Sequence, residues 1–489
     1  MRYRYIIFLT IVVYCFVSFA ACEDKYEHYG NNPNEVLSFS HDTLAFDTLF
    51  STVGSTTLKL MVYNRHDKPL LISSIYLAGA NRSGFRINVD GFSGISFNDI
   101  EILANDSMYV FVEATLDENG IDNPLLVTDS ILFNTNTVTQ QVILTGYGQD
   151  VYLLKGGNDI TTDAVLPNNK PWLIYDSLVV RENAMLTIPE GVTLYMHNNA
   201  VINVYGTLKI NGTLERPVRI RGDKLNATVG VSYDRLPGQW SGIYFAPESY
   251  NNEINHAHIR NGKYGLIFDA STPEQSKLKL TNSVLTNVYY DLFSAENCQI
   301  EVANCELSNA GGALLNLNGG KYRFTHCTIA NYFVWSARTS AAVCLKNYRM
   351  QDGADSPLPL EQADFFNCII YGAKTSEINL DAYTKQADIA FNYLLDYCLI
   401  KMEDAHIDPT HVTHPVTNKD PLFRLIDDDE NYIFDFRLKE NSPAIDQGND
   451  AYGTLFPFDL DGKSRFVGEH VDMGAYEYYP SNSRHIRPL

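Results

Sequence analysis

The chain reads HAHIRN at 256–261, NSVLTN at 282–287, NCELSN at 304–309 and HCTIAN at 326–331, four copies of one six-residue pattern. Their starts are 26, 22 and 22 residues apart, and NCIIYG (367–372) repeats the pattern after a longer gap. A period of this length suits a coil of three short strands and three turns. The repeat therefore predicts an all-β solenoid made of stacked coils.

Equivalent positions of stacked coils lie above one another, so each position of the pattern predicts a column of side chains. The fourth position is always aliphatic and predicts an interior ladder. The second position is small or cysteine, and we expect buried thiols there rather than disulfides or metal ligands, because free cysteine behaves as a small hydrophobe. The sixth position predicts an asparagine ladder at a turn, where Asn tolerates a left-handed backbone. The cysteine column is Cys305, Cys327 and Cys368, and the asparagine ladder is Asn261, Asn287, Asn309 and Asn331.

The stretch PEGVTLYMHNNAVINVYGTLKINGTLERPVRIRG (189–222) resembles the first coils of right-handed parallel β-helix proteins of the pectate-lyase-like type. This resemblance continues to about residue 480 and implies a right-handed parallel β-helix over 150–480. Before it, residues 36–149 hold short alternating runs about ten positions apart, which predict a β-sandwich. Its opening, 37–77, resembles the Hydin-like immunoglobulin-type modules of surface proteins, which implies a spacer or a binding domain.

The N-terminus, MRYRYIIFLTIVVYCFVSFAA (1–21), has two arginines, an apolar run and small residues before a cysteine. This order is typical of an export signal peptide. SFAAC (18–22) resembles a lipobox, which implies that Cys22 carries the lipid; an ordinary signal peptide cut near Ala21 is the alternative. The acidic residues that follow resemble the surface-export signal of Bacteroidetes-type lipoproteins. We expect a tether over 22–35 and a lipid-anchored outer-membrane protein exposed at the cell surface.

The formal net charge is −21, from 58 acidic and 37 basic residues. Such a surface repels phosphate backbones, so we do not expect a nucleic-acid partner. The longest break in the repeat, 338–360, nevertheless carries several basic side chains. Because insertions in solenoids gather on one face, this segment predicts a ligand face, with an ordinary surface loop as the alternative. Its candidate residues are Arg338, Lys346, Tyr348 and Arg349.

The C-terminal segments NSPAIDQGNDAYG (441–453), FDLDGKSR (458–465) and VDMGAYEY (471–478) resemble a tail found on many secreted β-helix proteins. DLDG (459–462) resembles the start of a calcium loop, but the twelfth position holds His470 instead of Glu. We therefore favour a carboxylate–arginine network that closes the end of the solenoid, followed by a short tail over 481–489. The network comprises Asp446, Asp459, Asp461, Arg465, Asp472 and Glu477.

No group of residues has a spacing specific to catalysis. The hypothetical catalytic side chains on one face, and a histidine-rich loop with 5- and 3-residue gaps, are weak candidates. We therefore expect no metal and no cofactor, and favour a non-enzymatic module that binds or displays a glycan or a protein partner. A polysaccharide lyase or glycoside hydrolase is one alternative, and a structural part of an outer-membrane assembly is another. The weak candidates are Tyr289, Tyr290, Asp291, Lys277, Lys279, Arg323 and His326 on the face, and His406, His411 and His414 in the loop.

Overall fold

The computed structural model describes residues 29–120, 124–225, 227–228, 230–351, 354–386 and 388–480. The predicted signal peptide, the first half of the tether with Cys22, and the segment 481–489 lie outside these residues. The chain divides into two compact units, and the boundary in the sequence lies between Asp150 and Val151. Within the described residues, no helix is both long enough and apolar enough to cross a membrane.

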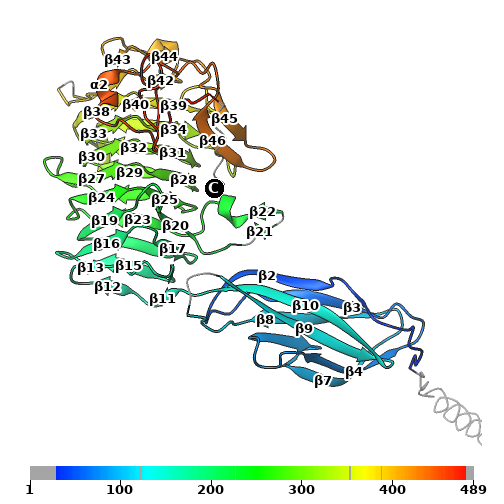
Figure 1. Cartoon of the computed structure of the whole chain (residues 1–489). Helices are drawn as coiled ribbons and strands as arrows, with labels where there is room; N and C mark the ends of the chain where they lie inside the picture. Colours follow the sequence, from blue (N-terminus) through cyan, green and yellow to red (C-terminus); the bar gives the residue numbers. More distant parts are fainter. Residues whose placement is uncertain are drawn as a thin grey trace, which may run out of the picture. The chain divides into compact units, whose positions relative to one another are not determined.

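The first unit is a β-sandwich of two five-stranded sheets (Figure 1). Alternate side chains such as Leu60 and Val62 point into one core shared by both sheets. Strand β10 pairs with β2 in parallel, and the other ladders of this unit are antiparallel. One sheet contains β1 (Ser38–Phe39), β3 (Leu58–Tyr63), β8 (Ser107–Ala114), β5 (Phe85–Val89) and β6 (Phe92–Gly94), and the other β2 (Thr43–Phe50), β10 (Val138–Gln149), β9 (Leu125–Thr135), β4 (Leu70–Leu77) and β7 (Ser96–Ile102).

The second unit is a parallel β-helix, which confirms the predicted fold class (Figure 1). The chain visits three parallel sheets in turn, here called sheet 1, sheet 2 and sheet 3. Sheet 1 consists of β11 (Tyr152–Leu154), β14 (Trp172–Ile174), β17 (Thr193–Met196), β20 (Val218–Gly222), β25 (Ala257–Arg260), β28 (Val284–Val288), β31 (Glu306–Ala310), β34 (Thr328–Asn331), β39 (Ile369–Gly372), β42 (Leu399–Ile400) and β44 (Val416–Thr417).

The other two sheets complete each coil. Sheet 2 consists of β12 (Asn158–Ile160), β15 (Ser177–Val180), β18 (Val201–Val204), β23 (Gly242–Phe245), β26 (Leu266–Phe268), β29 (Phe293–Glu296), β32 (Leu315–Asn318), β35 (Val343–Lys346) and β40 (Ile378–Asp381). Sheet 3 consists of β13 (Ala164–Val165), β16 (Met185–Pro189), β19 (Thr207–Asn211), β24 (Asn252–Asn255), β27 (Ser276–Thr281), β30 (Gln299–Ala303), β33 (Gly320–Thr325), β38 (Leu360–Phe366), β41 (Leu394–Asp396) and β43 (Val412–Thr413).

The solenoid core is built from columns of identical or similar side chains. The fourth position of the repeat lies in sheet 1, in register from coil to coil, and is buried. Phenylalanines stack in the same way in sheet 2, where the rings of Phe245 and Phe268 are 4.5 Å apart. Since inward and outward positions alternate along each strand, the residues between these columns form three separate outer faces. The aliphatic ladder is Ile259, Leu285, Leu307, Ile329 and Ile370.

Short excursions leave the coils at a few places. A small pair, β21 (Ala227–Thr228) with β22 (Val231–Ser232), and the 3₁₀ turn η1 (Tyr233–Arg235) follow β20. The hairpin of β36 (Tyr348–Gln351) and β37 (Ala354–Pro357) follows β35, and the turn η2 (Asp404–His406) follows β42. After the last coil come the hairpin of β45 (Phe423–Asp427) and β46 (Ile433–Leu438) and the single helical turn α2 (Asp450–Gly453).

Candidate functional site

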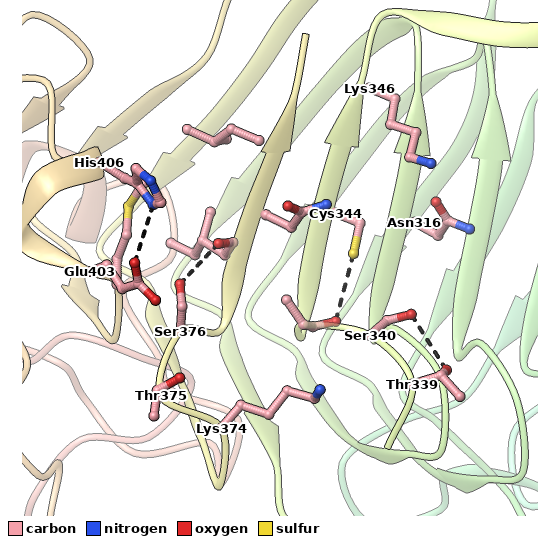
Figure 2. Close-up of a pocket in the computed structure, with 15 residues that line it drawn as sticks. Asn316, Thr339, Ser340, Cys344, Lys346, Lys374, Thr375, Ser376, Glu403 and His406 are labelled. Atoms are coloured by element: carbon pink, nitrogen blue, oxygen red, sulfur yellow. Dashed lines mark hydrogen bonds and ion pairs between the residues drawn. The ribbon is translucent and has the colours of Figure 1, made fainter. Parts of the chain in front are cut away.

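Two hollows lie over the outer face of sheet 2 and together form a groove across its strands. The larger, of about 710 Å³, lies over β32, β35 and β40, and the smaller, of about 470 Å³, lies over β26, β29 and β32. Asn316 and Lys346 line both hollows, so the two are continuous. Figure 2 shows Lys346 and Lys374 at opposite edges of the larger hollow, with Cys344 between them and Asn316 to the right.

The floor of the groove is a column of short, mostly neutral polar side chains. Strand register places Ile267, Ser294, Asn316, Cys344 and Asn379 one above another on successive strands. Parallel strands lie about 4.8 Å apart, so this column of five strands is about 19 Å long. Amide and hydroxyl groups both donate and accept hydrogen bonds, which suits a ligand rich in hydroxyl groups.

The turns that lead into sheet 2 form one rim of the groove. Thr339, Ser340 and Thr375 line the larger hollow from such turns. Tyr264 and Tyr290 lie in the corresponding turns before β26 and β29, outside the lining of either hollow, and their rings stack with centroids 4.8 Å apart.

Tyr289 packs edge-on against Tyr290, with a centroid separation of 5.0 Å. These tyrosines are 37–47% exposed, so their rings remain available to a ligand.

Asp269 and Glu296 line the smaller hollow, and Asp291 and Asp381 lie beside the groove; these four carboxylates have close partners, whereas Glu403 in the larger hollow lies 3.9 Å from His406. Glu296 pairs with Arg349 at 2.9 Å, and Asp381 accepts a 2.7 Å hydrogen bond from the Tyr348 hydroxyl. Asp269 accepts a hydrogen bond from the hydroxyl of Tyr244, and the Asn316 amide donates to Asp291 at 3.0 Å. Each of these four acids is therefore held by a neighbour.

Tyr348 and Tyr244, which bond to carboxylates in or beside the groove, are not poised to act as bases. The hydrogen bond to Asp381 raises the pKa of Tyr348 to about 12, and burial and Asp269 raise the pKa of Tyr244 further. Burial raises the pKa of the Cys344 thiol to about 11. A hydroxyl or thiol with a raised pKa holds its proton at neutral pH and is a poor general base or nucleophile.

Of the insertion residues predicted to face a ligand, only Lys346 lines the groove. Arg338 is buried, and its guanidinium contacts both oxygens of the buried Glu377, at 2.7 and 2.6 Å. Tyr348 and Arg349 are bonded to Asp381 and Glu296, as described above. Lys346 Nζ lies 3.5 Å from Asp381, so all four of the named residues have partners within the protein, and the ligand face stays a prediction.

The segment after the last coil, residues 421–480, is here called the tail. Its network was predicted to close the end of the solenoid, but the tail lies elsewhere. It runs along the outer face of sheet 1, where the Gly474 N–H donates to Asn367 O and the Ala475 N–H donates to Thr328 Oγ1. Gly474 has φ of 97°, and a Cβ there would lie 2.8 Å from Thr328 Oγ1. The backbone of the tail therefore needs glycine to approach the sheet so closely.

The predicted carboxylate–arginine network is only partly present. Arg465 is fully buried, donates to Asn304 Oδ1 at 2.6 Å, and lies near Asp459, Asp472 and Glu477. Asp461 instead binds Arg437 through two hydrogen bonds of 2.7 Å. Asp446 does not contact Arg465 and accepts from the backbone N–H of His470.

The structure buries all three thiols of the predicted cysteine column. They are free thiols, and the Cys327 N–H points to Cys368 Sγ at 3.5 Å. At the sixth position, Asn261, Asn287 and Asn331 donate mainly to backbone carbonyls, and Asn309 accepts from the Tyr332 N–H.

Hydrogen bonds between side-chain amides occur instead at the first position of the pattern. A ladder at this position was not predicted from the sequence. There Asn304 Nδ2 donates to Asn282 Oδ1 at 2.7 Å, and Asn282 Nδ2 donates to Asn255 Oδ1 at 2.8 Å. The first position has φ of 47–55° in seven successive coils. The recurrence of Asn and His at this position was the available signal. These residues are His256, Asn282, Asn304, His326, Asn367, Tyr397 and His414.

The weak catalytic candidates do not share one face. Lys277 is buried and donates to the Ala246 carbonyl at 2.5 Å, whereas Lys279 and Arg323 lie on the outer face of sheet 3. His326 is buried at a turn. His406 alone of the three loop histidines lines the groove. Among the described residues, no group of three or more His, Cys, Asp or Glu is placed to hold a metal ion.

Comparison with known proteins identifies no family. No protein-family model and no curated protein matches the sequence. Among solved structures, a family 123 glycoside hydrolase from Clostridium perfringens matches with 7% identity and a TM-score of 0.17, over 24% of this chain and 30% of that one. The catalytic domain of a GH87 alpha-1,3-glucanase in complex with tetrasaccharides matches with 10% identity and a TM-score of 0.14, over 70% and 82%. Likenesses this low carry no argument about function.

Proposed function

We propose that this protein is a lipid-anchored surface protein of the Bacteroidetes type whose solenoid binds a glycan without cleaving it. The observation that carries the proposal is the groove over sheet 2. Its length, its floor of amide and hydroxyl groups and the exposed tyrosines in the turns that precede β26 and β29 suit an extended oligosaccharide. Hydroxyls of a sugar would bond to the floor, and the apolar faces of sugar rings would stack on the tyrosines.

Binding without cleavage is favoured by the state of the ionisable groups. Glycoside hydrolysis needs two carboxyl groups that face each other across the substrate. Asp269 and Glu296 in the groove and Asp381 beside it are each engaged by a Tyr or Arg neighbour, and Glu403 in the groove lies 3.9 Å from His406. A tyrosine that acts as the base of an elimination needs a lowered pKa, and burial or hydrogen bonding raises the pKa of Tyr244 and Tyr348 instead.

The remaining parts of the chain have roles in this proposal. A lipid on Cys22 would hold the protein at the outer membrane, and the sandwich at 36–149 would act as an immunoglobulin-like spacer. The proposed partners are therefore the membrane, through the lipid, and a glycan. No nucleic acid is expected, because the net charge is −21.

Affinity electrophoresis and product assays would test the proposal. The full-length protein would be run through gels that contain neutral or acidic polysaccharides, with and without calcium. The same mixtures would be assayed for new reducing ends and for the absorbance of unsaturated products. Retention without products supports the proposal. Products from any glycan would show an enzyme, and no retention on any glycan would overturn glycan binding.

Two variants would localise the binding to the groove. Asn316→Ala removes an amide from the floor, and Tyr290→Ala removes a stacking ring from the turn before β29. Each is expected to weaken retention about tenfold, because one good polar or aromatic contact is worth roughly 1–2 kcal/mol. Lys279→Ala, on the outer face of sheet 3, is the control and should be retained like the wild type. Equal weakening by the control variant would place the binding elsewhere.

A further inference from the structure

A cluster of three arginines lies on the outer face of sheet 1, before the strands on which the apolar side of the tail packs. The loop between β45 and β46 reaches the adjacent turn η1, where the Asn431 carbonyl accepts a hydrogen bond from Arg235. Arg219 and Arg221 alternate with the buried Val218 and Ile220 along β20, and therefore point outward. Arg260, on the next strand β25, also points outward. The apolar underside of the tail packs on later strands of this sheet, from Val284 in β28 onward.

A single carboxylate serves two of these arginines. Asp234 lies in the turn η1, and its Oδ1 is 2.7 Å from both Arg221 Nη1 and Arg260 Nη2. Arg219 is exposed and makes no ion pair within the described part of the chain. Arg221 also donates from Nε and Nη2 to the carbonyls of Gly222 and Lys224, so it is held in place and Arg219 has the most freely available guanidinium. Three positive charges thus face the single carboxylate of Asp234, in a protein with a net charge of −21.

Other exposed arginines near this end of the solenoid have one acid each. Arg181 pairs with Asp159 at 2.7 Å, and Arg216 pairs with Glu190 at 2.8 Å. The excess of positive charge is therefore particular to the Arg219–Arg221–Arg260 cluster and is not a general property of the surface.

The pKa of the neighbouring His258 indicates the same excess of positive charge. His258 is the register partner of Arg219 on the adjacent strand β25, and Arg260 lies two residues further along that strand. Burial and the charges of Arg219 and Arg260 lower the pKa of His258 to about 4. Among the described residues, no carboxylate offsets these charges at His258, which therefore stays neutral at neutral pH.

We propose that Arg219, Arg221 and Arg260 form a binding site for an oxyanion, namely a carboxylate or sulfate group. Planar guanidinium groups bind such anions through paired N–H donors. The anion would lie beside Arg219, where no internal acid competes, and Asp234 would keep the other two side chains extended. This site lies on a different sheet from the groove and does not depend on the glycan proposal. The oxyanion could be carried by an acidic sugar or be a free ion.

Calorimetric titration of the full-length protein at constant ionic strength would test this site. The probes are trigalacturonate, its neutral methyl ester and sodium sulfate. Tighter binding of trigalacturonate than of sulfate would support the site and show a sugar-borne anion, whereas similar binding of both would support a site for free oxyanions. Equal binding of the methyl ester, or no binding of any charged probe at millimolar concentration, would overturn the proposal.

Three substitutions make the test specific. Arg219→Gln should weaken binding of the charged probes about tenfold, because it removes a charge-assisted contact. Asp234→Asn removes the competing negative charge and should strengthen binding several-fold. Arg216→Gln is the matched control, since it removes an arginine that has its own acid. The same affinity in Arg219→Gln and Arg216→Gln would overturn the proposal.

These outcomes are separable from the glycan proposal. Arg219→Gln should keep the wild-type retention on neutral polysaccharides, because the groove lies over sheet 2. Thermal unfolding of each variant verifies folding, and Arg219 makes no ion pair among the described residues whose loss would disturb it. If neutral glycans fail to bind while the charged probes bind, the groove proposal fails and the oxyanion site stands.

Discussion

Asn304 combines three roles at one position of the repeat. Its backbone has φ of 55°, at the turn from sheet 3 to sheet 1. Its amide nitrogen donates to Asn282, and its amide oxygen accepts from the buried Arg465 of the tail. The same side chain therefore joins two coils to each other and fastens the tail to them.

The roles of backbone and side chain at Asn304 can be separated by substitution. Asn304→Gly keeps the left-handed backbone but leaves Arg465 short of an acceptor, and should lower the free energy of unfolding by about 2–3 kcal/mol. Asn304→Ala should cost about 1 kcal/mol more, because Ala resists positive φ. Urea unfolding followed by circular dichroism measures both.

Asn251 provides the control for the energetic cost of placing Ala at a positive φ. It is exposed and has φ of 55°, so Asn251→Ala should show only the cost of about 1 kcal/mol for the left-handed conformation. A wild-type unfolding curve for Asn304→Gly would show that the side-chain bonds contribute nothing.

His258 predicts an acid-dependent loss of stability. Its pKa is about 4 in the folded protein and near 6.5 when unfolded, so the unfolded state binds more protons between these values. Stability is complete above pH 6.5 and falls as the pH drops towards 4, by about 2 kcal/mol for this partly exposed group. His258→Gln should flatten this part of the profile, measured by urea unfolding at pH 4, 5, 6 and 7. An unchanged profile would contradict the assignment.

At the scale of elements, the tail depends on a buried carboxyl group that is protonated at neutral pH. Burial and the neighbouring Asp472 raise the pKa of Glu477 to about 9, and the pKa of Asp472 itself is raised to about 6. The folded state then holds protons that the unfolded state releases above about pH 4.5. Stability from this network is complete at low pH and is lost as the pH rises towards 9.

Glu477→Gln mimics the protonated form and should remove most of this alkaline loss. At pH 5 the variant should match the wild type, and at pH 8.5 it should be more stable by on the order of 3 kcal/mol. Unfolding curves at the two pH values measure the difference. Glu361→Gln, which removes a surface carboxylate paired with Lys321, is the control and should show no such pH-dependent gain.

Elements were predicted from the sequence where a side-chain pattern alone determines them. The aliphatic fourth position was enough to predict inward strands of sheet 1, because stacking repeats the same environment in every coil. The partners of Arg338 and Arg349 were not predictable, since Glu377 and Glu296 belong to other coils 39 and 53 residues away. The groove itself depends on which turns lead into sheet 2, and no local pattern marks those turns.

At the scale of the whole solenoid, the three outer faces differ in chemistry. Sheet 2 carries the groove with its uncharged floor. Sheet 1 carries the arginine cluster on its earlier strands and the tail on its later strands. Sheet 3 carries a column of alternating charges that suits contact with water, because opposite charges lie on adjacent strands. That column is Lys209, Glu253, Lys279, Glu301, Arg323 and Asp364.

The tail covers an apolar strip that a solenoid exposed to water would not otherwise tolerate. Ala330, Ile369 and Leu399 point outward from sheet 1 and pack with Phe436 and Met473 in a core separate from that of the coils. A charge at Met473 would be desolvated without a partner, so Met473→Asp should detach the tail at a cost of about 3–5 kcal/mol. The coils keep their own core, and the β-sheet circular dichroism should persist.

Limited proteolysis would show whether this separation of the two cores is correct. In Met473→Asp, trypsin should cut first within the tail hairpin, for example after Arg437, before it digests the coils. Leu455→Asp places the same charge on a tail residue that is 68% exposed, and it should be cut like the wild type. Retention on glycan gels should survive in Met473→Asp, because the tail lies on sheet 1 and the groove on sheet 2. Joint loss of the tail, the coils and glycan retention would show that the two cores unfold as one unit.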